Sequence, residues 1–231
     1  MLSIAISMKQ PLQILVFLIL ILSLGYIFVA YALSLTLPPL PYSTVIRDVR
    51  GEEIAEIIAD ERIRHRALTY PDIPRVYASG IIWLEDRDFW DNNGISIRGI
   101  IRSMVHNIKA GSIVEGGSTL SAQYIRNALW INDERDLTHK MLETLYAIRL
   151  NHMLSKEEIL TAYVNRIGFG HLNYGLRSAA LYYFGREPQN LTPAEQIALL
   201  VIPKNPNTYD PYIHEEAFRA RYQQVISILE T

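Results

Sequence analysis

Two adjacent carboxylates at the end of an apolar run are the first residues suited to acid–base chemistry. Glu85 and Asp86 close that run and precede Phe89. Burial beside Trp83 and Phe89 is expected to raise a carboxyl pKa toward the working range of a general base. The same acids would also fit an ordinary surface ion pair with Arg87. This segment alone therefore leaves a catalytic and a structural interpretation open.

A glycine turn that leads into a helix forms the second candidate group. The sequence Gly-Gly-Ser-Thr occupies residues 116–119. A helical period of about 3.6 places four polar residues on one face, namely Thr119, Gln123, Arg126 and Asn127. Glycines, hydroxyls and a basic residue at a helix N-terminus suit an anion. The alternative is a solvated helix face, which usually carries Glu and Lys rather than these side chains.

A lysine and a glutamate three residues apart form the third group. Lys140 and Glu143 share one face of a helix predicted within 135–154, beside the small residue Ala147, and Arg135 lies upstream of both. The other face is apolar, as in a helix that packs on a core. The two residues would fit a surface ion pair of small energetic value, or a ligand site between small neighbours. The spacing does not choose between these interpretations.

The segments that must position these groups are predicted to be mostly helical. Two stretches within residues 42–66 alternate in polarity and suit short strands or an extended connector. Farther along, Ser155 with Glu158 and Thr192 with Glu195 form capping boxes, which mark helix starts. The sequence therefore predicts one mostly α domain after the connector.

The N-terminal segment is predicted to be a membrane anchor. Residues 12–37 carry no charge, and a helix needs about 20 apolar residues to cross a bilayer. A cleaved signal peptide is the alternative, favoured only by Ala-Tyr-Ala at 30–32. Lys9 places the N-terminal side in the cytoplasm by the positive-inside rule. We therefore divide the chain into a cytoplasmic tail (1–11), a transmembrane anchor (12–37), a connector (38–66) and an external domain (67–231).

Composition limits the classes of function that the chain can have. It has 231 residues, a net charge of −2 and no cysteine. The absence of cysteine excludes disulfides, thiolate zinc sites and cysteine nucleophiles. The nearly balanced charge argues against a nucleic-acid partner. The six histidines are scattered, without the close pairing of a metal site.

The candidate groups belong to five segments that follow one another along the chain. Their residues are, in chain order, Glu85, Asp86, Phe89, Gly94, Ser118, Thr119, Gln123, Arg126, Asn127, Arg135, Lys140, Glu143, Ser155, Tyr163, Asn165, Thr192, Glu195, Pro206, Tyr209 and Pro211. Together these segments resemble the motifs of glycosyltransferase family 51, which comprises the peptidoglycan glycosyltransferases and the polymerase domain of class A penicillin-binding proteins. The resemblance runs from about residue 69 to 211.

The resemblance implies a lysozyme-like α-helical domain that acts on lipid II through a cleft near the membrane. Glu85 would deprotonate the acceptor sugar's 4-hydroxyl, which attacks the lipid-linked donor chain with inversion. The diphosphate leaving group would be held by Arg126, Arg135 and Lys140. Glu143 would assist at the donor side, where a divalent cation, Mg²⁺ or Mn²⁺, is possible, although no cofactor is required with certainty. Further substrate contacts are expected from Asp86, Phe89, Ser118, Thr119, Gln123, Asn127 and Asn165.

The resemblance also implies a location and partners. The chain would cross the bacterial inner (cytoplasmic) membrane once, with its domain on the outer, periplasmic side. Its partners would be the growing glycan strand, membrane lipid and other proteins of cell-wall synthesis or division. Residues 95–113 interleave apolar and basic side chains, which suits either a segment at the lipid interface or a core-facing helix. No transpeptidase domain follows residue 231, so no penicillin-sensitive serine is expected.

Three positions depart from the family pattern. Asn92 stands where the family usually has histidine, Ala122 where it has glutamine, and His139 where arginine is common. These departures leave open a catalytically weakened membrane scaffold of the cell-wall machinery. A lytic glycosidase of lysozyme-like fold is a second alternative, since it also uses a carboxylate in a cleft. It needs no diphosphate site, so Arg126, Arg135 and Lys140 argue against it.

Overall fold

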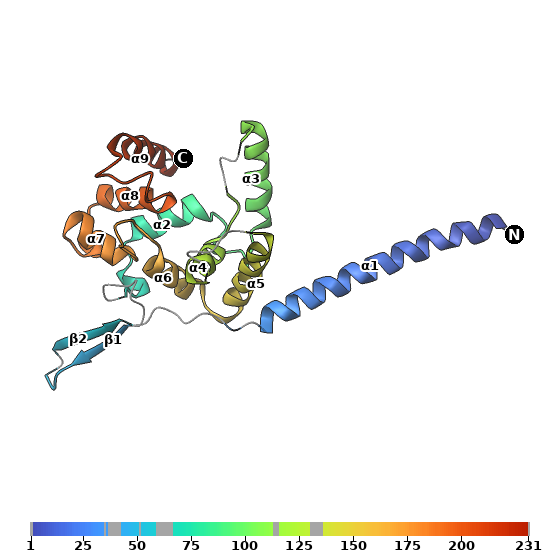
Figure 1. Cartoon of the computed structure of the whole chain (residues 1–231), viewed down its shortest axis with the longest axis horizontal. Helices are drawn as coiled ribbons and strands as arrows, with labels where there is room; N and C mark the ends of the chain where they lie inside the picture. The colour runs from blue at the N-terminus through green and yellow to red at the C-terminus, as the bar shows by residue number, and fades with distance from the viewer. Residues whose placement is uncertain are drawn as a thin grey trace.

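A long N-terminal helix extends away from a helical domain (Figure 1). The computed structural model describes residues 2–34, 36, 43–50, 52–58, 67–112, 116–129 and 136–230. Helices dominate these residues, and a two-stranded hairpin holds their only strands. The predicted class, a mostly α domain behind one apolar N-terminal helix, is confirmed.

Helix α1 (Leu2–Ser34) is apolar on all sides. Its section Pro11–Tyr31 is long and apolar enough to cross a membrane, judged by length and composition. Its large side chains are exposed; Phe17, for example, is 64% accessible. Hydrophobic side chains at this density belong in a protein core or in lipid. The C-terminal end of α1 lies beside the domain and contacts α5 (Leu137–Met153).

The predicted strands lie in the connector. Strands β1 (Ser43–Arg47) and β2 (Glu53–Ile58) pair antiparallel. Asp48 holds the turn between them, because its Oδ1 accepts from the backbone N–H groups of Arg50 at 2.8 Å and Glu52 at 2.9 Å. The alternation in polarity within 42–66 therefore does mark a hairpin.

The domain contains eight further α-helices among the described residues. These are α2 (Arg75–Glu85), α3 (Ile97–Ala110), α4 (Leu120–Leu129), α5, α6 (Lys156–Arg166), α7 (Leu176–Phe184), α8 (Pro193–Val201) and α9 (Glu215–Leu229). Short 3-10 turns are η1 (Tyr70–Asp72), η2 (Pro188–Asn190) and η3 (Ile202–Lys204). Helix α4 packs against α5 and α6, and α2 packs against α8 and α9. The core between them is built on large, fully buried rings, namely Tyr77, Phe89, Tyr124, Tyr163 and Phe169.

Both predicted capping boxes are present. Ser155 begins α6 by accepting from the Glu158 N–H, and the Glu158 carboxylate accepts from the Ser155 N–H at 2.8 Å. Thr192 and Glu195 make the same exchange at the start of α8, at 2.7 Å. These backbone hydrogen bonds hold the pKa of both glutamates below the ordinary value.

The lowered pKa of Glu195 predicts a pH dependence of domain stability. The carboxylate form is favoured by folding, so its contribution is complete above the ordinary value of 4.5 and is lost as the pH falls through the lowered folded-state pKa. Glu195→Gln is therefore expected to be less stable than wild type at pH 7, with the difference shrinking in strong acid. Urea unfolding of the detergent-solubilised chain at several pH values measures this. A difference that is constant with pH would contradict it.

Candidate active site

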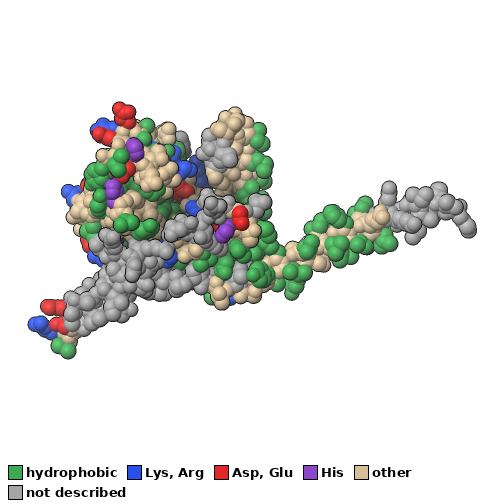
Figure 2. Space-filling view, viewed as in Figure 1, with side chains coloured by type: hydrophobic (Ala, Val, Ile, Leu, Met, Phe, Trp, Pro, Cys, Tyr) green, Lys and Arg blue, Asp and Glu red, His purple; other side chains and the backbone are tan. Residues whose placement is uncertain are grey.

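A cleft of about 950 Å³ opens into the domain. Its lining comes from α2, α3, α4, α5, α6, η3 and α9, so residues far apart in the sequence meet there. Six of the predicted site residues line it, namely Glu85, Ser118, Gln123, Arg126, Lys140 and Glu143. Figure 2 shows the molecule hollowed beside α3, with basic side chains in the hollow.

Glu85 is the last residue of α2 and lies on the cleft wall, partly exposed. Its Oε2 accepts a hydrogen bond from Gln123 Nε2 at 2.8 Å. Gln123 is on α4, and its own Oε1 accepts from the hydroxyl of Tyr163 on α6 at 3.2 Å. The carboxylate is thus oriented from one side and open to the cleft on the other, as a general base must be.

Asp86 joins the end of α2 to the start of α4. Its carboxylate is buried and accepts from Asn92 Nδ2 at 3.0 Å and from the backbone N–H of Leu120 at 3.0 Å. Burial raises the pKa of Asp86, and the hydrogen bonds from Leu120 and Asn92 offset part of that rise. Because Leu120 begins α4, this contact fixes Gln123 on α4 relative to Glu85.

The two aromatic residues near the paired carboxylates differ in burial. Phe89 is fully buried, and the Lys156 ammonium lies 4.9 Å from its ring centre, in the network around Asp86. Trp83 is 40% exposed and is covered by the Arg87 guanidinium at 4.7 Å. Within this motif, burial therefore raises the pKa of Asp86. Asp86 is also the residue that links α2 to α4.

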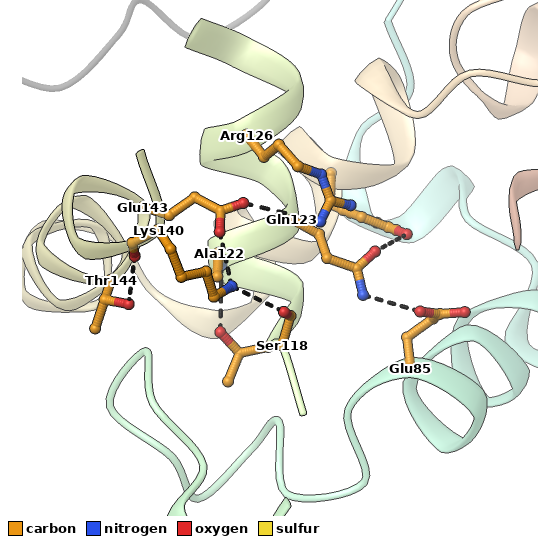
Figure 3. Close-up of polar contacts among 10 residues, drawn as sticks. Glu85, Ser118, Ala122, Gln123, Arg126, Lys140, Glu143 and Thr144 are labelled. Atoms are coloured by element: carbon orange, nitrogen blue, oxygen red, sulfur yellow. Dashed lines mark hydrogen bonds and ion pairs between the residues drawn. The ribbon is translucent and has the colours of Figure 1, made fainter. Parts of the chain in front are cut away.

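A cationic cluster occupies another part of the cleft wall and consists of Ser118, Arg126, Lys140 and Glu143. Lys140 Nζ lies 2.7 Å from Glu143 Oε2 and 3.0 Å from Ser118 Oγ. Arg126 lies 3.8 Å from the other Glu143 oxygen. Two cations thus share one carboxylate, and the cluster keeps a surplus positive charge that suits an anion. Gln123 and Arg126 lie between this carboxylate and Glu85 (Figure 3).

Thr119 does not reach the cleft surface. Its side chain is 3% exposed and donates to the Gly94 carbonyl at 2.8 Å. Gly94 has φ +93°, and a Cβ there would lie 2.4 Å from the Ala147 carbonyl oxygen, so only glycine fits. Asp86, Phe89 and Thr119 are all buried and do not line the cleft, so their expected substrate contacts stay predictions.

Two predicted residues lie away from the cleft lining, and one is outside the described residues. Asn165 is buried and hydrogen-bonds both backbone groups of Leu68, at 2.8 Å to N and 2.9 Å to O. It ties α6 to the segment that enters the domain, which we take as its role. Asn127 is partly buried, and its carbonyl accepts from Arg166 at 3.3 Å. Arg135 lies outside the described residues.

The cleft has further polar residues that sequence reasoning did not single out. They are Arg102 and His106 on α3, Lys204 on η3, and Arg221 on α9. Arg102 and His106 are four residues apart, so a helical period predicts that they share a face. Lys204 and Arg221 have no such local signal, because only the tertiary packing of the C-terminal helices brings them to the cleft.

The donor set of the cleft does not build a metal site from the described residues. Across these parts of the chain, no three His, Asp or Glu side chains gather closely enough to hold an ion. Glu143, the residue expected beside a cation, is already compensated by Lys140 and Arg126. We therefore route no step of the mechanism through a metal.

An oriented carboxylate and a surplus of positive charge in one cleft suit chemistry that activates a hydroxyl and stabilises an anion. Comparison with known proteins agrees. The family model described as Transglycosylase matches residues 50–230. The chain belongs to this transglycosylase family. This membership confirms the prediction of an enzyme of the peptidoglycan glycosyltransferase class.

Individual relatives are penicillin-binding proteins. The chain is 32% identical over 187 residues to penicillin-binding protein 1F of Bacillus subtilis (strain 168), covering 81% of this chain and 26% of that protein. It is 34% identical over 187 residues to penicillin-binding protein 1A of Streptococcus pneumoniae, covering 80% and 26%. A crystal structure of penicillin-binding protein 1A from Haemophilus influenzae matches with a TM-score of 0.39 and 18% identity, over 83% of this chain and 18% of that one. The chain thus spans about a quarter of the length of these curated relatives.

Proposed function

We propose that the chain polymerises lipid II into glycan strands, with release of polyprenyl diphosphate. The observation that carries this proposal is the presence of an oriented base, Glu85, and of the cationic cluster in one cleft. A hydroxyl nucleophile needs a base, and a departing diphosphate needs positive charge. Both requirements of the reaction are met by side chains of this chain.

In the proposed step, Glu85 takes the proton of the acceptor sugar's 4-hydroxyl. The hydroxyl oxygen then forms a bond to the anomeric carbon of the lipid-linked donor, and the bond from that carbon to the diphosphate oxygen breaks. Attack from the face opposite the leaving group inverts the configuration. The diphosphate leaves with the bonding electrons, and its charge is stabilised by Lys140 and Arg126, with Arg135 proposed as a third cation from the motif. Glu85 afterwards returns its proton to solvent.

Glu143 holds the cations in place in this proposal. Its side chain is 6% exposed and contacts both Lys140 and Arg126. A carboxylate so engaged is poorly suited to be the second free acid of a lytic glycosidase, which needs two carboxyl groups across the scissile bond. The contacts of Glu143 therefore favour transfer over hydrolysis.

Helix α3 is proposed to lie on the membrane surface. It begins at Ser96, whose side chain accepts from the Gly99 N–H, and its outer apolar residues are widely exposed. They include Ile97, Ile101, Met104 and Ile108, at 70%, 58%, 58% and 73%. Figure 2 shows hydrophobic side chains on the edge of α3 that faces the direction in which α1 extends. This exposure favours the lipid interface over a core-facing helix.

The proposed arrangement in the cell follows from these two helices. Helix α1 spans the bacterial inner membrane once, α3 rests on its outer surface, and the cleft opens toward lipid-linked substrate. The growing glycan strand would leave by the same cleft. Other proteins of cell-wall synthesis or division remain proposed partners.

Single-cysteine variants test the position of α3, because the chain has no native cysteine. Ile101→Cys and Leu172→Cys alter side chains of similar exposure, 58% and 66%, on α3 and on a loop distant from it in sequence. In vesicles, Ile101→Cys is expected to react at least about tenfold more slowly with a charged maleimide than Leu172→Cys, since lipid excludes the reagent. In denaturant the two rates should be equal. Equal rates in vesicles would show that α3 does not lie on the membrane surface.

Incubation of the full chain with lipid II in detergent or vesicles tests the proposed function. Formation of glycan polymer together with free polyprenyl diphosphate is the expected result. Cleavage of finished glycan without polymer formation would identify a lytic glycosidase instead. Binding of lipid II without turnover would identify a scaffold.

A further inference from the structure

A buried tyrosine continues the contact between Glu85 and Gln123 into the core. The hydroxyl of Tyr163 on α6 lies 3.2 Å from Gln123 Oε1 on α4, and Gln123 Nε2 lies 2.8 Å from Glu85 Oε2 on α2. Tyr163 and Gln123 are 40 positions apart in sequence, and Gln123 and Glu85 are 38 apart. Three helices that pack around one point of the cleft wall thus meet in one line of hydrogen bonds.

The polarity of this line is fixed when Glu85 is ionised. A carboxylate only accepts, so Gln123 must turn its NH₂ group toward Glu85 and its carbonyl toward Tyr163. The hydroxyl then donates to that carbonyl. Burial, with the nearby charge of Glu85 as a second cause, raises the pKa of Tyr163 well above its ordinary value, so the hydroxyl keeps its proton at working pH.

The tyrosine itself is held without freedom to move away. Its side chain is 1% exposed and lies in the core cluster, with only the hydroxyl end facing the cleft. Gln123, by contrast, is partly exposed. Without the bond to Tyr163, its amide would be held at one end only and could rotate. The rigid partner in the line is therefore Tyr163.

We propose that Tyr163 is a positioning residue of the catalytic base: its hydroxyl locks the Gln123 amide in the orientation that holds ionised Glu85 toward the acceptor hydroxyl. The proposal rests on the proposed function of Glu85 as the base. It gives Tyr163 no contact with the reacting atoms. Its effect therefore falls on the turnover step, with substrate binding left unchanged.

Tyr163→Phe tests the proposal because it removes only the hydroxyl and keeps the buried ring. The kcat for lipid II polymerisation is expected to fall about 3- to 10-fold, the loss of one hydrogen bond. The KM for lipid II should stay unchanged. The charged groups around the cleft are the same in this variant, including Arg87, Arg102, His106, Lys204 and Arg221.

Tyr77→Phe is the matched control. Tyr77 is fully buried on α2, and its charge state is also coupled to Glu85. Within the described residues its hydroxyl has no hydrogen-bond partner. The same chemical change at Tyr77 is therefore expected to leave kcat within about twofold of wild type. Equal effects of the two variants would overturn the proposal.

A double-mutant cycle and a spectrum of the Gln123 amide complete the test. Once Gln123→Leu has removed the amide, Tyr163→Phe should cost nothing further, whereas additive losses would overturn the proposal. The side-chain NH₂ signals of ¹⁵N-labelled Gln123, identified by their absence in Gln123→Leu, should change position in Tyr163→Phe and stay in place in Tyr77→Phe. This readout needs no turnover, so a wild-type chain that does not polymerise lipid II refutes the proposed function while the spectrum still decides the hydrogen-bond line. Unchanged Gln123 signals in Tyr163→Phe would refute the line alone.

Discussion

Glu85→Gln is expected to lower the rate of lipid II polymerisation by about 10² to 10⁴-fold, the usual contribution of a general base. The amide has nearly the same shape and still accepts from Gln123 Nε2, so the local hydrogen bond survives. It cannot take a proton from the acceptor hydroxyl. Because Glu85 is partly exposed at the end of α2, the domain should remain folded. Initial rates of polymer formation, with unfolding curves for both proteins, measure the effect.

Glu157→Gln is the control for the loss of a carboxylate. Glu157 is exposed in the first turn of α6 and does not line the cleft. Its substitution should leave the rate within about twofold of wild type, as expected of a surface site. If Glu85→Gln retains more than a tenth of the wild-type rate, Glu85 is not the base. If it also retains full biological activity in cells, the scaffold alternative becomes the better account.

Much of the helical framework is predictable from the sequence because its signals are local. The capping boxes at Ser155 and Thr192 mark the starts of α6 and α8. The glycine turn before Leu120 and the periodic face after it predict α4 and place Gln123 and Arg126 together. Such patterns depend on residues within four positions of one another, which is the range over which a helix fixes geometry.

The division of motif residues into those that line the cleft and those that build its wall is not local. Asp86 and Glu85 are adjacent acids, yet one is buried against Leu120 and the other lies on the cleft wall. Asn165 hydrogen-bonds to Leu68, 97 positions away. Sequence spacing cannot separate such roles, because they depend on which helix ends pack against each other. That packing is determined by the whole core.

The departure at Asn92 also has a physical account in the structure. Its amide donates to both oxygens of Asp86, at 3.0 and 3.1 Å, and its Oδ1 accepts from the Gly94 N–H at 3.0 Å. A buried carboxylate therefore keeps its partners although the usual histidine is missing. The joint between α2 and α4, which sets the position of Glu85, is thus preserved in this chain.

Lys140→Met is expected to lower the polymerisation rate by about 10² to 10³-fold, the range for losing one preorganised donor to a developing negative charge. Methionine keeps the length and apolar stem of the side chain, so the loss is chiefly one of charge. Lys140→Arg is the control, because it keeps the positive charge beside Ser118 and Glu143. It should retain far more activity than the methionine variant.

The loss of Lys140 also leaves Glu143 with a structural cost that must be separated from the catalytic one. Glu143 is 6% exposed, and its other ion-pair partner, Arg126, lies 3.8 Å away. Breaking a buried ion pair from one side destabilises a protein, whereas neutralising both sides largely relieves that cost. Adding Glu143→Gln to Lys140→Met should therefore restore the unfolding midpoint without restoring the rate. If the rate recovers with the stability, or if Lys140→Met alone polymerises nearly as fast as wild type, the cationic cluster is not where the leaving group is stabilised.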